Sequence, residues 1–90
     1  MNKNLQKKLK EEIKVIPDFP LKGIMFQDVF SITENPKLFK DVINELSGLC
    51  KKHKITKVVG IEARGFIFGS LVAYKNAMPF VPIRKKGKLP

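Results

Sequence analysis

The residues best suited to chemistry stand together in the run 62–65, which reads Glu-Ala-Arg-Gly. This run follows a short apolar stretch and precedes a predicted helix, so its backbone amides would lie at a helix N-terminus, where the helix dipole favours an anion. Arg64 adds a planar, permanently charged guanidinium that matches phosphate oxygens, and Gly65 allows close approach of the backbone. The spacing predicts an anion site. An equally good interpretation is a plain turn with a surface ion pair between Glu62 and Arg64.

A second group of positive charges lies at 84–88, which reads Arg-Lys-Lys-Gly-Lys. The chain has 16 lysines but only two arginines, Arg64 and Arg84, and each of the two groups contains one of them. Both groups follow predicted strands, and α/β proteins bind ligands outside the carboxyl ends of parallel strands. We therefore expect the two groups to converge on one polyanion, although a solvated basic tail is the commoner meaning of such a run.

The elements that would position these groups form one βαβ unit. Residues 57–61 are a continuous apolar run rich in β-branched residues, which is typical of a strand buried on both faces. Residues 66–75 predict a buried helix, and residues 80–84 predict a second, parallel strand in which Pro82 favours an edge or bulge position. Two parallel strands do not make a stable sheet, so the sequence predicts the front portion of a larger α/β domain.

The first half of the chain contains two further predicted helices. Apolar residues recur at helical spacing over 2–14, and the prolines at 17 and 20 are expected to end this helix. Residues 18–33 predict a compact loop with a short extended piece. Asn35-Pro36 is typical of a helix start, and the apolar spacing that follows continues to about residue 53.

Length and composition exclude several classes of protein. Ninety residues allow one domain, and no apolar run approaches the roughly 18–20 residues of a membrane span. The N-terminus has no continuous apolar segment of a secretory signal, and a single cysteine indicates a reducing compartment such as the cytoplasm. A formal charge of +10 favours an anionic partner, but lysines that only confer solubility explain it equally well.

Several blocks in order along the chain resemble the adenine phosphoribosyltransferases, which have the type I phosphoribosyltransferase fold. The resemblance runs from about residue 16 to residue 90 and implies the N-terminal half of a single domain, because members are about twice this length. It implies an incomplete α/β fold, with an N-terminal helix and adenine-binding segment over 1–34 and the first part of the α/β core over 35–90. The blocks are Asp18-Phe19-Pro20, Lys22-Gly23-Ile24-Met25-Phe26-Gln27-Asp28, residues 58–69 and residues 81–90.

The resemblance also implies a reaction, in which adenine and 5-phosphoribosyl-1-pyrophosphate give AMP and pyrophosphate with Mg²⁺ carried by the diphosphate substrate. Phe26 would stack on adenine, and backbone groups at Met25 and Gln27 would contact its polar edge; members commonly have arginine where Gln27 stands. Arg64 would be catalytic through its grip on pyrophosphate. The implied pyrophosphate-binding set is Glu62, Ala63, Arg64, Gly65, Arg84, Lys85 and Lys88.

Related enzymes hold the first pair of the pyrophosphate loop as a cis peptide, so we expect one between Glu62 and Ala63. They are typically cytoplasmic homodimers, with the basic segment at 84–88 near a subunit contact. The adjacent acidic pair and Thr-Gly loop that bind ribose phosphate in the family have no counterpart in these 90 residues. We therefore expect the chain alone to be inactive. The alternatives are a small basic nucleic-acid-binding or regulatory module on the same scaffold, and a non-functional truncation.

Overall fold

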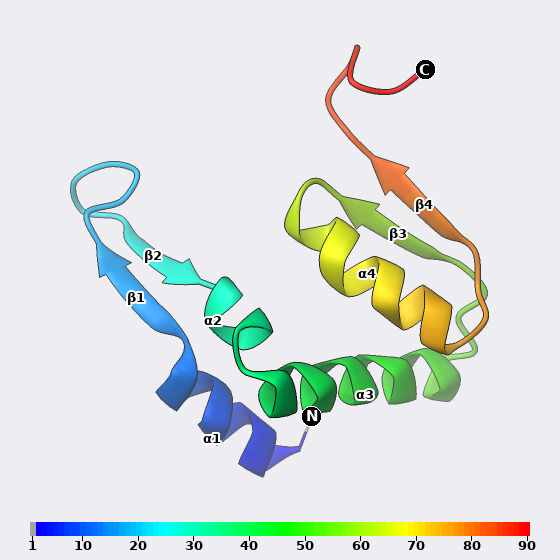
Figure 1. Ribbon diagram of the computed structural model, residues 1–90, viewed down its shortest axis with the longest axis horizontal. Helices are drawn as coiled ribbons and strands as arrows, with labels where there is room; N and C mark the ends of the chain where they lie inside the picture. Colours follow the sequence, from blue (N-terminus) through cyan, green and yellow to red (C-terminus); the bar gives the residue numbers. More distant parts are fainter. Residues whose placement is uncertain (1) are drawn as a thin grey trace. The chain divides into compact units, whose positions relative to one another are not determined.

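The computed structural model describes residues 2–90, which form two compact units. The first unit ends at Val42 and the second begins at Ile43. Figure 1 shows the order of the helices and strands along the chain. They are α1 (Lys3–Glu12), β1 (Lys14–Pro17), β2 (Met25–Asp28), α2 (Phe30–Thr33), α3 (Pro36–Lys52), β3 (Val58–Ile61), α4 (Arg64–Lys75) and β4 (Phe80–Ile83).

Helix α1 begins as a capped helix and ends earlier than the sequence predicted. The side-chain oxygen of Asn2 accepts hydrogen bonds from the amides of Asn4 (2.7 Å) and Leu5 (3.3 Å), which satisfies donors that a helix start leaves open. Leu5 is buried. The prolines expected to end the helix do not do so, because the helix stops at Glu12 and the chain enters β1 at Lys14.

Strands β1 and β2 form an antiparallel hairpin, of which the sequence predicted only a short extended piece within the loop over 18–33. Ile16 lies opposite Phe26, and Pro17 lies opposite Met25. The extended piece is β2, and the short helix α2 that follows it was not predicted. The amide of Lys14 donates to the hydroxyl of the buried Ser31 in α2 over 3.1 Å, which ties the hairpin to that helix.

Helix α3 begins where the sequence predicted. The side-chain oxygen of Asn35 accepts a hydrogen bond from the amide of Leu38 over 3.1 Å, as an N-cap does, and Pro36 is the first helical residue. At 17 residues α3 is the longest helix of the described range. Within residues 2–90 no helix is both long enough and apolar enough to cross a membrane.

Strands β3 and β4 pair in parallel, and α4 packs along them, as predicted for a βαβ unit (Figure 1). Val58 lies opposite Phe80, and Ile61 lies opposite Ile83. Helix α4 starts at Arg64, two residues earlier than expected. It covers one face of the strand pair, where a Cβ added at Gly69 would lie within 2.8 Å of the Phe80 ring.

The other face of the β3–β4 pair is exposed, so the prediction of a strand buried on both faces is wrong. Side chains on this face are between 38% and 66% exposed. The burial pattern along β3 alternates, because only alternate residues of a strand point toward the helix. The exposed set, called the open face below, is Val59, Ile61, Val81 and Ile83.

Candidate functional site

The loop between β3 and α4 carries the run 62–65 and approaches the backbone of β3 closely. The peptide bond between Glu62 and Ala63 is cis, which confirms the prediction. A Cβ on Gly65 would lie 3.2 Å from the Cα and carbonyl carbon of Gly60, and a Cβ on Gly60 would lie 2.5 Å from the carbonyl oxygen of Gly65. A side chain at Gly60 would therefore force the loop or the Phe80 ring to move, and the space at Gly65 is tight.

The carboxylate of Glu62 joins the loop to the end of β4. Its Oε2 accepts a hydrogen bond from Nε of Arg84 over 2.8 Å, and its Oε1 accepts one from the amide of Lys85 over 3.0 Å. The amide of Glu62 itself donates to the carbonyl oxygen of Ile83 over 3.1 Å. The sequence suggested an ion pair between Glu62 and Arg64, and the ion pair that the structure shows for Glu62 is with Arg84 at the end of the neighbouring strand.

These bonds lower the pKa of the Glu62 carboxyl. The largest cause is the hydrogen bond from the Lys85 amide, followed by the one from the Arg84 guanidinium, and both favour the ionised form. The Glu62 side chain is 23% exposed and that of Arg84 is 36% exposed. The carboxylate is therefore ionised at neutral pH and bound to two donors of one strand end.

Arg64 occupies the first position of α4, at the positive end of a 12-residue helix. Ala63 is the N-cap and provides no side-chain hydrogen bond to the helix start, and the first turn contains no acidic residue. The partial positive charge at this helix end and the exposed Arg64 side chain therefore point to a site that favours an anion.

The segment after β4 places further positive charge beside the loop. The Lys85 amide is bound to Glu62, and the amide of Lys88 donates to the carbonyl oxygen of Lys85 over 3.1 Å. This turn includes Gly87 at φ +88°, a conformation that L side chains rarely adopt. The structure thus brings the loop 62–65 and the residues Arg84 and Lys85 together, as expected from parallel strand ends, with Lys88 in the adjoining turn.

The adenine segment predicted around Phe26 lies in the β1–β2 hairpin of the first unit. The half-buried Phe26 ring meets the Phe19 ring edge to face, with centroids 5.0 Å apart. The loop between the strands is fastened by a hydrogen bond of 2.8 Å from the Gly23 amide to Oδ1 of Asp18. Met25 is 61% exposed, and Gln27 is exposed on the same strand.

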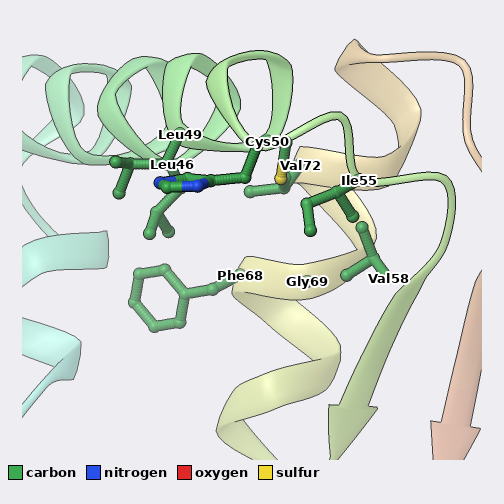
Figure 2. A pocket seen from close by; sticks show the side chains of 9 residues that line it. Leu46, Leu49, Cys50, Ile55, Val58, Phe68, Gly69 and Val72 are labelled. Atoms are coloured by element: carbon green, nitrogen blue, oxygen red, sulfur yellow. The ribbon is translucent and has the colours of Figure 1, made fainter.

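An apolar cavity of about 360 Å³ lies between the end of α3, the chain that follows it and α4 (Figure 2). Nearly all of its surface is apolar, and none of the residues predicted to bind substrate lines it. Cys50 is half-buried and lines this cavity. The lining residues are Leu46, Leu49, Cys50, His53, Ile55, Val58, Phe68, Gly69 and Val72.

The donor set of the loop does not fit a metal centre held by protein side chains. Among residues 2–90 no group of three His, Cys, Asp or Glu side chains gathers to bind a metal ion. Glu62 is the one carboxylate of the run 62–65, and both of its oxygens already accept hydrogen bonds.

Comparison with known proteins gives a consistent match to one enzyme. No family model matches the chain. The adenine phosphoribosyltransferase of Aeromonas salmonicida is 49% identical over all 90 residues, which are 50% of that protein, and that of Yersinia pestis is 52% identical over 84 residues, which are 45% of it. The chain therefore spans about half the length of the curated relatives it matches.

Solved structures give the same result. The adenine phosphoribosyltransferase of Saccharomyces cerevisiae matches with a TM-score of 0.89 and 38% identity, over 97% of this chain and 54% of that one. The enzyme of Rhodothermus marinus matches with a TM-score of 0.85 and 45% identity, over 99% of this chain and 51% of that one. The resemblance seen in the sequence and the predicted α/β fold are confirmed, over about half of such an enzyme.

Proposed function

We propose that this chain supplies the adenine-binding and pyrophosphate-binding elements of an adenine phosphoribosyltransferase that acts in purine salvage. The observation that carries the proposal is the joining of the loop 62–65 to Arg84 and Lys85 at the carboxyl ends of two parallel strands. This is the edge at which α/β proteins bind ligands. The match to half of each relative supports the same function.

In the proposed reaction a ring nitrogen of adenine attacks the anomeric carbon of 5-phosphoribosyl-1-pyrophosphate. The new C–N bond forms as the C–O bond to pyrophosphate breaks, pyrophosphate leaves with the bonding electron pair, and the attacking nitrogen loses its proton. Negative charge therefore grows on the leaving group. Fixed positive groups stabilise it electrostatically, and we assign this role to Arg64 as the catalytic residue, with Arg84, Lys85, Lys88 and the start of α4.

The adenine site is proposed at β2. The Phe26 ring would stack on the purine, and the edge-to-face contact with Phe19 would hold it in place. Met25 and Gln27 are two residues apart on the strand, so their backbone groups point to the same edge, as needed to contact the polar edge of a base. Gln27 would act through its backbone only.

Relatives support the substrates and products. The Saccharomyces cerevisiae structure is a complex with adenine, and that of Trypanosoma brucei contains AMP, pyrophosphate and ribose 5-phosphate. We propose a cytoplasmic, homodimeric enzyme whose Mg²⁺ arrives on the diphosphate rather than on side chains of this chain. The 90 residues lack an adjacent acidic pair followed by a Thr-Gly loop, so we expect no AMP formation from them alone.

The formal charge of +10 supports a second candidate, a module that binds nucleic acid. Calorimetric titrations with inorganic pyrophosphate and with a single-stranded oligonucleotide, each at about 50 and 200 mM salt, separate the two functions. The enzyme function predicts pyrophosphate binding that is weakened by Arg64→Ala. It is overturned if pyrophosphate does not bind while the oligonucleotide binds with a steep dependence on salt.

A further inference from the structure

We propose that Glu62 is a positioning residue, which orients Arg84 and the Lys85 backbone for pyrophosphate and does not itself contact the anion. This inference rests on the proposed function and deepens it. The resemblance placed Glu62 among the pyrophosphate-binding residues, but a carboxylate and a diphosphate repel each other. The structure shows a different use for its two oxygens.

The arrangement around Glu62 joins two strand ends that are distant in sequence. Parallel register pairs Ile61 with Ile83, which sets Glu62 beside Arg84, 22 residues further along the chain. The Glu62 amide donates to the Ile83 carbonyl oxygen, and its carboxylate accepts from the Arg84 side chain and the Lys85 amide. One residue therefore holds the end of β4 by three hydrogen bonds.

Arg84 binds Glu62 through Nε, and this choice of nitrogen decides which N–H groups can face a ligand. A guanidinium has five N–H donors, and the bond to Glu62 engages the one on Nε. This bond restrains the orientation of the group, while the four N–H donors on the two terminal nitrogens take no part in it. Those donors form the side of the fork that matches two oxygens of a phosphate.

Positioning also reduces the entropic cost of binding. A partly exposed arginine has many rotamers, and a ligand that must immobilise it loses affinity. Glu62 restricts the Arg84 side chain before pyrophosphate arrives. By charge alone, however, removal of a carboxylate near the site would strengthen binding of an anion. The two effects have opposite signs, so one substitution distinguishes them.

The test compares inorganic pyrophosphate affinity of the 90-residue chain and of Glu62→Gln by calorimetry. Glu11→Gln, on α1, is the control because it changes net charge equally. We expect Glu62→Gln to bind about 2- to 10-fold more weakly, the range for one side chain that must be immobilised on binding, and Glu11→Gln to bind as the parent chain does. Equal or tighter binding by Glu62→Gln overturns the positioning role while the proposed function stands.

A second measurement decides the case in which the Glu62→Gln variant does not fold. The Nε–H resonance of Arg84 in the parent chain should move as the Glu62 carboxyl titrates, because the two are directly hydrogen bonded. A resonance that follows this titration supports the positioning role, whereas a parent chain that binds no pyrophosphate overturns this role together with the proposed function. A resonance that ignores the titration overturns the role.

Discussion

Nε of Arg84 donates a hydrogen bond to Oε2 of Glu62 over 2.8 Å, and this contact joins the ends of two parallel strands. The neighbouring Lys85 amide binds the other carboxylate oxygen over 3.0 Å. The acidic side chain of Glu62, in an otherwise basic site, thus binds Arg84 and Lys85, and we assign it the role of orienting them. The positive groups near it are Arg64 at the start of α4 and the lysines that follow Arg84.

Removal of either arginine should weaken pyrophosphate binding. We expect Arg64→Ala and Arg84→Ala each to lose about 10-fold or more in affinity, because a hydrogen bond to a charged group contributes about 1.5–3 kcal/mol. Titration calorimetry measures the change. Lys51→Ala, at the end of α3, removes the same charge elsewhere and should change affinity little. A loss for Lys51→Ala as large as that for the arginines would show that net charge alone binds the anion.

Phe26 should be the side chain on which adenine affinity depends. Phe26→Ala is expected to weaken adenine binding about 10-fold, since stacking of a base on an aromatic ring contributes about 1–3 kcal/mol. Equilibrium dialysis with labelled adenine measures this. Gln27→Ala is the matched comparison on the same strand, and it should leave affinity unchanged if Gln27 acts through its backbone. The assignment fails if Gln27→Ala loses more affinity than Phe26→Ala.

The Glu62 contacts predict a specific pH dependence of stability. The carboxyl pKa is lowered in the folded chain from its ordinary value of 4.5, so the folded state binds fewer protons than the unfolded state between the two values. The stabilisation is therefore complete above pH 4.5 and is lost as the pH falls through the lowered pKa. Urea unfolding of the parent chain and Glu62→Gln should show a difference at pH 6 that disappears in stronger acid. A difference that stays constant would contradict the lowered pKa.

Two glycines should respond to alanine in opposite directions. Gly60→Ala would place a Cβ 2.5 Å from the Gly65 carbonyl oxygen and 2.6 Å from the Phe80 ring, which should cost about 1–3 kcal/mol in free energy of unfolding. Gly48→Ala lies in α3, where the new Cβ would meet nothing within 4 Å apart from its chain neighbours and the helix's own backbone, and alanine there should stabilise by about 0.5–1 kcal/mol. Urea midpoints measure both changes. Equal midpoints for the two variants would contradict the packing of the loop against β3.

The open face of the β3–β4 pair should cause self-association. Its apolar side chains are 38% to 66% exposed, and contiguous exposed apolar groups are sites of association. Ile61→Thr combined with Ile83→Thr places hydroxyls at two opposed positions while keeping β-branched residues. Sedimentation velocity should show less self-association for this double variant. The prediction is wrong if the double variant associates as strongly as the parent chain.

The sequence allowed prediction of those features that local chemistry or strand order determines. Asn35 caps α3 because its side chain reaches an amide only three residues away. The convergence of the loop 62–65 and Arg84 follows from parallel strands with a helix between them. The cis peptide at Glu62 was expected through resemblance, not through any property of composition.

The hairpin, the ion pair of Glu62 and the exposed face of β3 could not be predicted, because they depend on contacts between segments that are separated in the sequence. Strand β1 reads Lys-Val-Ile-Pro, which shows no alternation of apolar and polar residues, and all four residues are exposed. No pattern in the sequence therefore revealed the hairpin. The ion pair of Glu62 depends on the register of β3 against β4, which a local view of Glu62 and Arg64 cannot give. The exposure of Val59 and Ile61 depends on whether another element packs against that face of the strands, and their apolar character alone does not reveal this.

A nuclear magnetic resonance titration of the isotope-labelled chain with inorganic pyrophosphate tests the central claim most directly. The claim is that the loop 62–65 and the segment after β4 form one anion site. We expect the largest amide shifts at Ala63, Arg64, Gly65, Lys85 and Lys88, with saturation at a single affinity. Shifts spread over the lysines of α1 and α3, or no saturation, would contradict the account.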